Sequence, residues 1–287
     1  MDPAPPPLPP PRPALPTGAV LAPIKAVVPG WSHVPFFLML LAALVGVYLI
    51  FWLCLLGATA LHSTPQDWIS ALQSGDIRHA TMVSLITSTL ASLLAVLTAL
   101  PVGYFLARWS FPGKSIVEAA LDIPIVLPPM VVGLCLLIFF QTTVGHLIEK
   151  IIPLTYTVYG VVLAQYTVAA AFAIRTLRGT FDHLPRRPED VALTLGATPA
   201  RAFWHVALPG AKRGTVAAFC IAWARSLGEF GPILVFAGAT RGKTEVLPTT
   251  VWLELSVGNL EAAVAVSLLM ILLAVAVLIV VRAFGER

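Results

Sequence analysis

The chain has 287 residues, of which 58% are hydrophobic and only 11% are Asp, Glu, Lys or Arg. Soluble globular domains carry about 25% charged residues, so this composition excludes an ordinary soluble protein. Long apolar runs with few charges indicate a polytopic α-helical membrane protein instead. The net charge of +4 is no nucleic-acid signal, because in membrane proteins the placement of Lys and Arg matters more than their sum.

The first segment of the chain is rich in proline. Eleven prolines fall within residues 1–30, and proline lacks the N–H that a helix interior needs. We therefore expect residues 1–35 to form a disordered cytoplasmic tail with polyproline-like character.

Six apolar stretches follow, each about 20 residues long, which is enough to cross a hydrocarbon core of about 30 Å. Pro124, Pro128 and Pro129 interrupt the third stretch, so we expect it to be kinked or to begin late. The predicted fold is an all-α polytopic membrane protein with six transmembrane helices, forming one transmembrane domain over residues 36–282. The stretches are 36–58, 82–107, 121–140, 155–176, 215–238 and 261–281.

The three cysteines offer no sign of metal or redox chemistry. No pair among Cys54, Cys135 and Cys220 has the spacing of a metal or redox motif. Each falls inside an apolar run, so we expect buried, unreactive thiols.

The distribution of Lys and Arg predicts which segments face the cytoplasm. With the N-terminus inside, the inside segments hold thirteen Lys and Arg residues and the outside segments hold four. Cytoplasmic segments carry the excess of these residues in membrane proteins. We therefore expect the N-terminus, the loop 177–214 and the C-terminal residues 283–287 on the cytoplasmic side, with Arg241 and Lys243 as a local exception outside.

The loop at about 185–213 has the pattern of a helix that ends at a glycine. Pro188 fits the first position of a helix, where its missing N–H costs nothing. Glu189 and Asp190 place negative charge in the first turn, which suits the positive end of the helix dipole. Gly196 is expected to stop this helix, since glycine reaches the left-handed conformation without a side-chain penalty.

A second short helix is expected directly after this turn. Thr198 can cap it and Pro199 fits its first turn, while Pro209–Gly210 ends it. Phe203, Val206 and Ala207 form one apolar stripe. The predicted structure is a helix-turn-helix with a small apolar face, and two interpretations follow from the pattern: a hairpin that lies on the lipid surface, or a docking site for a partner.

The spacing within this loop resembles the "EAA" loop of ATP-binding-cassette (ABC) transporter permeases. That motif is Glu-Ala-Ala, three residues, Gly, nine residues, Ile-x-Leu-Pro. Ala192, Gly196, Leu208 and Pro209 match it, while Asp190 stands for the Glu and valines stand for the first Ala and the Ile. The spacing is intact, and the substitutions keep charge or apolar character.

The resemblance extends over about residues 36–282. Residues 122–129 and the Ser-Leu-Gly-Glu-Phe-Gly sequence at 226–231 are similar to the molybdate/tungstate and sulfate branch of these permeases. Residues 247–263 are more similar to the molybdate/tungstate side.

This resemblance implies the non-catalytic, membrane-spanning subunit of an ABC importer in a bacterial or archaeal cytoplasmic (inner) membrane. A separate ATPase subunit would hold ATP and Mg²⁺, and an extracytoplasmic solute-binding protein would deliver an oxyanion, molybdate or tungstate first and sulfate or thiosulfate as the alternative. The chain would pair with itself or with a sister permease. The implied ATPase-coupling residues are Glu189, Asp190, Ala192, Gly196, Ala197, Leu208 and Pro209.

Two questions about charged residues stay open at this point. Glu189 and Asp190 either contact the ATPase or hold the first short helix in place. Arg225 and Glu229 lie four residues apart in an apolar run and so share a helix face. Ionisable groups at this depth are costly and commonly functional, so the pair either lines or gates a translocation pathway or fixes the packing of helices.

Other classes of protein find less support in the sequence. Residues 238–244 are similar to a phosphate-binding P-loop, but only three residues separate the glycines where the motif needs four. The spans lack an HExxH motif, a GxSxG motif and paired aspartates, which argues against an intramembrane enzyme. An ion-coupled carrier or channel is the alternative of another class, although no internal repeat of the kind common in carriers is visible.

Overall fold

The computed structural model describes residues 36–61 and 63–285, and every regular element in this part of the chain is helical. The predicted tail 1–35 lies outside the described residues, as do residues 62, 286 and 287. The long helices are α1 (Phe36–Leu61), α3 (Gly75–Arg108), α7 (Val158–His183), α11 (Lys212–Leu227) and α14 (Leu260–Gly285). The shorter helices are α2 (Pro65–Gln73), α4 (Lys114–Val126), α5 (Pro129–Phe140), α6 (Thr143–Glu149), α8 (Arg187–Thr194), α9 (Pro199–Ala202), α10 (Leu208–Gly210), α12 (Gly231–Phe236) and α13 (Leu247–Ser256).

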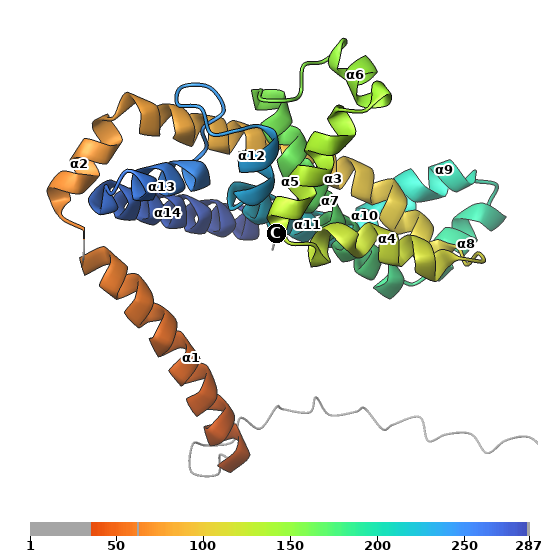
Figure 1. The fold of residues 1–287 in the computed structure, drawn as a ribbon. Helices are drawn as coiled ribbons and strands as arrows, with labels where there is room; N and C mark the ends of the chain where they lie inside the picture. The colour runs from red at the N-terminus through yellow and green to blue at the C-terminus, as the bar shows by residue number, and fades with distance from the viewer. Residues whose placement is uncertain (1–35, 62, 286–287) are drawn as a thin grey trace, which may run out of the picture. The chain divides into compact units, whose positions relative to one another are not determined.

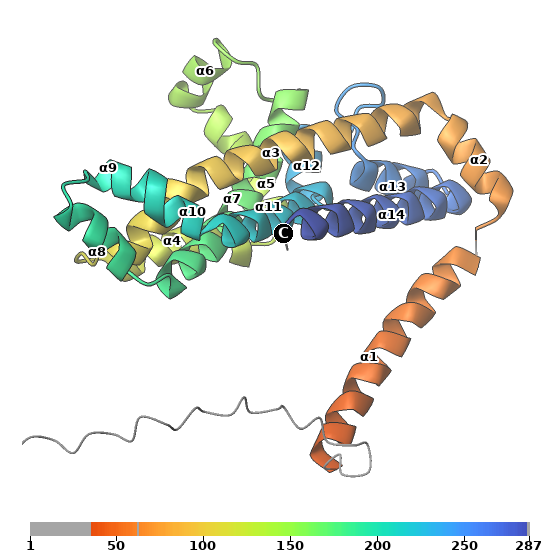
Figure 2. The ribbon, with the colours of Figure 1, turned by 180° about the vertical axis from the view of Figure 1, so that it is seen from behind.

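The chain divides into two compact units, Met1–Leu55 and Leu56–Arg287. Within the first unit the described residues belong to α1, an apolar helix of 26 residues without a charged side chain. In the second unit, the hairpin of α8 and α9 lies at one end, and α2 and α13 lie at the other (Figures 1 and 2).

Four of the described helices are long and apolar enough to cross a membrane: α1, α3, α7 and, within α14, residues 260–277. The third predicted span is divided into α4 and α5, which meet at a bend of 109°. The expected kink is therefore present, and its cause is the Pro128–Pro129 pair, which cannot continue the hydrogen-bond ladder of α4.

The fifth predicted span, 215–238, is also divided. It consists of α11, with 16 residues, and α12, with six, separated by residues 228–230. With the bent pair counted as one, the described helices provide up to five candidate spans. The count of six spans thus stays a prediction.

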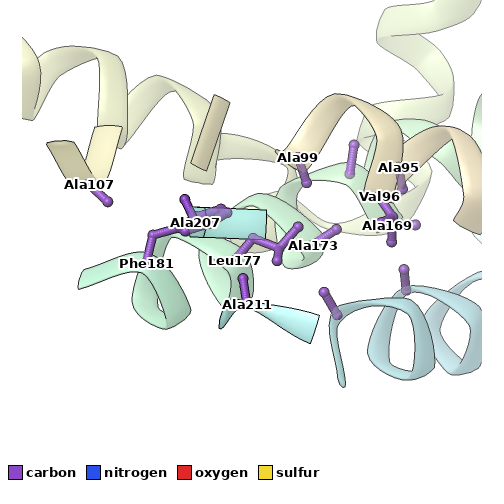
Figure 3. Close-up of a cluster of buried hydrophobic side chains, with 13 residues drawn as sticks. Ala95, Val96, Ala99, Ala107, Ala169, Ala173, Leu177, Phe181, Ala207 and Ala211 are labelled. Atoms are coloured by element: carbon purple, nitrogen blue, oxygen red, sulfur yellow. The ribbon is translucent and has the colours of Figure 1, made fainter. Parts of the chain in front are cut away.

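The centre of the second unit is an alanine-rich contact among α3, α7 and α11. The cluster includes Ala95 and Ala99 of α3, Ala169 and Ala173 of α7, and Ala218 of α11; several of its members are drawn in Figure 3. Small side chains let helix backbones approach closely, which is how helices associate where water cannot drive them together. A methyl group added at Gly103 of α3 would lie 2.9 Å from the backbone nitrogen of Arg178, so this approach requires glycine.

The prediction of buried cysteines is wrong for two of the three. Cys54 and Cys135 are exposed on the surface of the chain, and Cys220 is half-buried. The reason is that a membrane helix can turn apolar side chains toward lipid, so an apolar run does not by itself predict burial inside the protein.

Candidate functional site

The first hairpin helix, α8, ends in a glycine turn of the Schellman type. The amide of Ala197 donates to the Ala192 carbonyl at 3.0 Å, and the amide of Gly196 donates to the Leu193 carbonyl at 3.0 Å. Gly196 has φ +87°, the left-handed conformation expected from the sequence. Pro188 lies within the first two positions of α8, one residue after its start at Arg187.

The second half of the hairpin also follows the sequence pattern. The Thr198 hydroxyl accepts a hydrogen bond from the Arg201 amide at 3.3 Å and so caps α9. A π-helical turn over Phe203–Ala207 then leads into α10, which ends at Gly210. The pattern of the sequence does not indicate this wide turn. Pro209 explains it, because its ring conflicts with the carbonyl four residues earlier in a regular helix.

Several apolar side chains of the hairpin are exposed. Leu195, beside the glycine turn, is 83% exposed, and Trp204 on the second helix is 60% exposed. Val191 and Leu193 are also exposed, and so is Asp190. Exposed apolar side chains beside a compact turn are typical of a docking surface.

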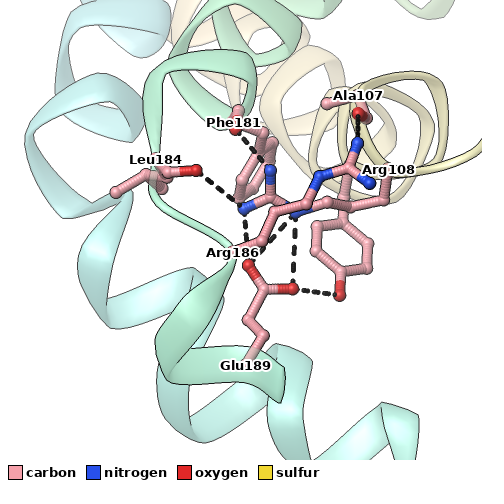
Figure 4. Close-up of polar contacts among 7 residues, drawn as sticks. Ala107, Arg108, Phe181, Leu184, Arg186 and Glu189 are labelled. Atoms are coloured by element: carbon pink, nitrogen blue, oxygen red, sulfur yellow. Dashed lines mark hydrogen bonds and ion pairs between the residues drawn. The ribbon is translucent and has the colours of Figure 1, made fainter. Parts of the chain in front are cut away.

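Glu189 points the other way, toward the helix bundle. Its side chain is 9% exposed and forms an ion pair of 2.5 Å with Nη2 of Arg108, itself 6% exposed. The Tyr104 hydroxyl donates to the other carboxylate oxygen at 2.8 Å. Figure 4 shows the carboxylate facing the Arg108 guanidinium. Glu189 and Asp190 are neighbours in the sequence, but Glu189 is buried and Asp190 is exposed.

Aromatic and small side chains fix the second hairpin helix to the bundle. The ring centroid of Phe203 lies 4.7 Å from that of Tyr104 and 6.4 Å from that of Phe181. Ala207 and Ala211 belong to the same buried cluster as Phe181 (Figure 3). Phe203 and Ala207 of the predicted stripe are thus turned inward, and Val206 is half-buried.

The remaining residues of the predicted coupling set have mostly backbone roles. Ala192 and Ala197 are half-buried and close the glycine turn through their backbones. Leu208 is half-buried, and Pro209 is exposed at the end of the π-helical turn. None of these four carries chemistry, so their contribution is the shape of the hairpin.

The predicted pair in the fifth apolar stretch is formed at the break between α11 and α12. Nη1 of Arg225 lies 2.8 Å from a carboxylate oxygen of Glu229, with side chains 28% and 1% exposed. Beside it, Nε2 of Gln165 on α7 donates to the Ser226 carbonyl at 3.0 Å. The Gln165 side-chain oxygen and the Ser226 hydroxyl are buried without a hydrogen-bond partner among the described residues. A polar cluster thus surrounds the break in the helix.

Sequence reasoning missed Tyr104, Arg108 and Gln165 as members of these sites. Arg108 and Glu189 are 81 residues apart in the sequence, so no spacing rule connects them. The available signal was weaker: Arg108 is a charge directly after a long apolar run.

Together, the apolar helices and the helical hairpin at one end of the bundle define a multi-pass membrane protein. A family model described as "binding-protein-dependent transport system inner membrane component" matches residues 99–287. The chain belongs to this family.

Several relatives are named as permeases. A probable molybdenum ABC transporter permease protein of Haloferax volcanii is 34% identical over 245 residues, covering 85% of this chain and 89% of that protein. A molybdenum transport system permease protein of Mycobacterium tuberculosis is 35% identical over 222 residues, covering 76% and 83%. A sulfate transport system permease protein of Escherichia coli is 32% identical over 208 residues, covering 71% and 75%.

The fold also matches solved structures. A chain of a bacterial ABC transporter involved in the import of the acidic polysaccharide alginate aligns with a TM-score of 0.67 at 17% identity, over 87% of this chain and 96% of that chain. At this identity the likeness concerns the fold alone. The family, in turn, speaks against an ion-coupled carrier, a channel or an intramembrane enzyme.

Proposed function

We propose that the hairpin of this permease subunit is the docking element for a separate ATPase subunit, which binds ATP and Mg²⁺ and drives import. The observation that carries the proposal is the exposure of apolar side chains on the hairpin, above all Leu195, which is 83% exposed beside the Gly196 turn. At this exposure, Leu195 packs against little of the described chain. A compact turn that presents it can enter a groove on a partner, where burying one such side chain contributes about 1.5–3 kcal/mol.

The proposed substrate is an oxyanion, molybdate or tungstate, delivered by an extracytoplasmic solute-binding protein. The support is the named activity of relatives at 34% and 35% identity. Sulfate is the second candidate, supported by the 32% identical relative named as a sulfate permease. We place the protein in a cytoplasmic membrane with both termini inside, and we expect it to act as a homodimer, with a heterodimer with a sister permease as the alternative.

The docking proposal is tested by copurification of the tagged full-length chain with its ATPase subunit. We expect Leu195→Asp and Gly196→Trp to lose the ATPase, because each alters the exposed tip of the hairpin. The matched control is Gly196→Asn, since Asn tolerates the left-handed conformation and a Cβ at this position meets nothing within 4 Å. Retention of the ATPase by Leu195→Asp and Gly196→Trp alike would contradict the proposal.

The substrate proposal is tested by uptake into proteoliposomes that contain the copurified complex and a solute-binding protein. We expect ATP-dependent accumulation of molybdenum and tungsten, measured by mass spectrometry, and competition between the two oxyanions. Uptake of radiolabelled sulfate that molybdate does not inhibit would favour sulfate over molybdate or tungstate as the substrate. Uptake that proceeds without ATP would reject the importer itself.

A further inference from the structure

The last two turns of α3 contact both helices of the hairpin. The Tyr104 hydroxyl donates to Glu189 of α8 at 2.8 Å, while the Tyr104 ring packs on Phe203 at 4.7 Å between centroids. Arg108 lies one turn further along the same face of α3. Tyr104 therefore contacts both helices of the hairpin at the same time.

Arg108 also holds the segment between α7 and the hairpin. Its Nη1 donates to the Phe181 carbonyl at 2.7 Å and its Nη2 to the Leu184 carbonyl at 3.4 Å, while Nε and Nη2 reach Glu189 (Figure 4). The last carbonyls of a helix have no partner inside it, so Arg108 satisfies the end of α7. A guanidinium can serve these acceptors together because its five N–H groups form a rigid planar fork.

A second contact runs in the opposite direction. Nη2 of Arg186, directly before α8, donates to the Ala107 carbonyl of α3 at 2.9 Å. The segment 184–186 is thus bonded to α3 from both sides. Movement of this segment away from α3 would break the bond of Arg108 to Leu184 and that of Arg186 to Ala107.

The ion pair at the centre of these contacts is shielded from water. Both side chains are less than 10% exposed, and buried pairs are screened by salt far less than surface pairs. Removing one member leaves the other as a buried unpaired charge. Asp190, one residue further on, is exposed and has no such role.

We propose that Tyr104, Arg108 and Glu189 form a rigid joint that makes the hairpin move as one body with α3 and α7. Glu189 is then a positioning residue, and it does not contact the ATPase. The coupling part of this proposal rests on the proposed docking of an ATPase, whereas the joint itself is a property of this chain alone.

The joint is tested first by hydrogen–deuterium exchange of the full-length chain without any partner. We expect amides in residues 186–198 to exchange roughly tenfold faster or more in Glu189→Gln and Arg108→Lys, because local opening governs exchange. Lysine keeps the positive charge of Arg108 but lacks the planar set of N–H donors. The Arg108→Lys variant therefore tests the hydrogen-bond geometry apart from the charge. Tyr104→Phe removes one hydroxyl and is a milder variant that keeps the test decisive if the others fold poorly. Asp190→Asn is the matched control and should exchange like the parent.

Coupling is tested in proteoliposomes that contain the copurified complex. We expect Glu189→Gln to retain the ATPase subunit but to transport roughly tenfold less substrate per ATP hydrolysed, in line with the rate losses that follow small misplacements. Equal exchange in Glu189→Gln, Tyr104→Phe and Asp190→Asn would overturn the joint. Faster amide exchange with an unchanged amount of substrate transported per ATP hydrolysed would overturn the role of the joint in coupling. A parent chain that retains no ATPase would reject the docking proposal and leave the exchange result to decide on the joint.

Discussion

Glu245 lies between α12 and α13, with its side chain buried and both carboxylate oxygens lacking a hydrogen-bond partner among the described residues. The nearby Thr250 hydroxyl donates to the Val246 carbonyl instead, at 3.1 Å. Burial raises the pKa of the Glu245 carboxyl above its usual value, and the negative charges of Asp76 and Glu254 add to the effect against the positive charge of Arg241. The folded state therefore binds the Glu245 proton more tightly than the unfolded state does.

This raised pKa predicts that Glu245→Gln stabilises the protein at neutral pH. A carboxyl with a raised folded pKa leaves stability intact below its unfolded pKa and lowers it as pH rises through the folded value. Glutamine avoids the ionisation, so we expect a gain of roughly 1–2 kcal/mol at pH 7–8 and little gain near pH 4. Thermal unfolding in detergent at the two pH values measures the difference.

The control for Glu245 is an acid without burial. Glu261, at the start of α14, is exposed, and Glu261→Gln should change unfolding little at either pH. A Glu245→Gln variant with the same unfolding temperature as the parent at every pH would contradict the prediction.

At the scale of single residues, the sequence predicts what local spacing controls. Gly196 and Thr198 were recognised because a turn and a cap involve neighbours three to five residues away. The same holds for Arg225 and Glu229, four residues apart on one face. The partner of Glu189 is 81 residues away, and only the packing of α3 against α7 brings it close. Its inward direction could not be predicted, because both sides of α8 carry plausible roles for an acid.

At the scale of elements, the break between α11 and α12 depends on an asymmetric ion pair. Glu229 is almost fully buried, whereas Arg225 keeps 28% of its side chain exposed and lies 6.0 Å from the ring centroid of Phe172 on α7. Removal of the arginine leaves a buried carboxylate without its counter-ion, whereas removal of the carboxylate leaves a cation that can still reach water. Substitution of Arg225 should therefore lower the stability of the chain more than substitution of Glu229.

This asymmetry predicts the outcome of a double-mutant cycle. Arg225→Ala should destabilise the chain by about 3 kcal/mol, and Glu229→Gln should cost clearly less. The double variant should recover part of the Arg225→Ala loss, giving a coupling energy of about 1–3 kcal/mol. Denaturation in mixed micelles measures the free energy of unfolding of the parent, the two single variants and the double variant.

Two outcomes of this cycle would decide the role of the pair. Additive losses would show that Arg225 and Glu229 are not coupled. A coupled pair whose neutral double variant folds well but no longer transports would favour the interpretation as pathway lining over helix packing, because packing alone would be restored.

The broken elements also show why spans are harder to predict than hairpins. A hydropathy pattern reports how apolar a stretch is, but not whether it continues as one helix. Pro128 and Pro129 predict the bend between α4 and α5, which is 109°. Pro232 lies in the first turn of α12, and its ring conflicts with the carbonyl of Gly228, four residues earlier, so a proline also marks the break between α11 and α12. The buried polar cluster around Ser226 forms only in the packed structure.

At the scale of the whole molecule, charge is distributed unevenly over the second unit. The hairpin end carries an excess of Lys and Arg from the end of α3 to the start of α11, while the opposite end, with α13, holds Arg241 paired with Glu254 at 2.6 Å. Arg241 and Lys243 stay a local exception, because the rule counts Lys and Arg whatever their partners, but the excess of these residues lies at the hairpin end. The hairpin end is therefore predicted to face the cytoplasm.

This sidedness is measured with single cysteines in a chain whose three native cysteines are replaced by alanine. Leu195→Cys, at the hairpin tip, and Lys243→Cys, in the segment before α13, both replace exposed residues. A membrane-impermeant maleimide should label Lys243→Cys in intact cells and Leu195→Cys only after lysis. Labelling of Leu195→Cys from outside would place the hairpin where no ATPase can reach it, and it would overturn both the topology and the docking proposal. Equal labelling after lysis is the control, because it shows that both thiols are reactive and that the membrane alone makes the difference.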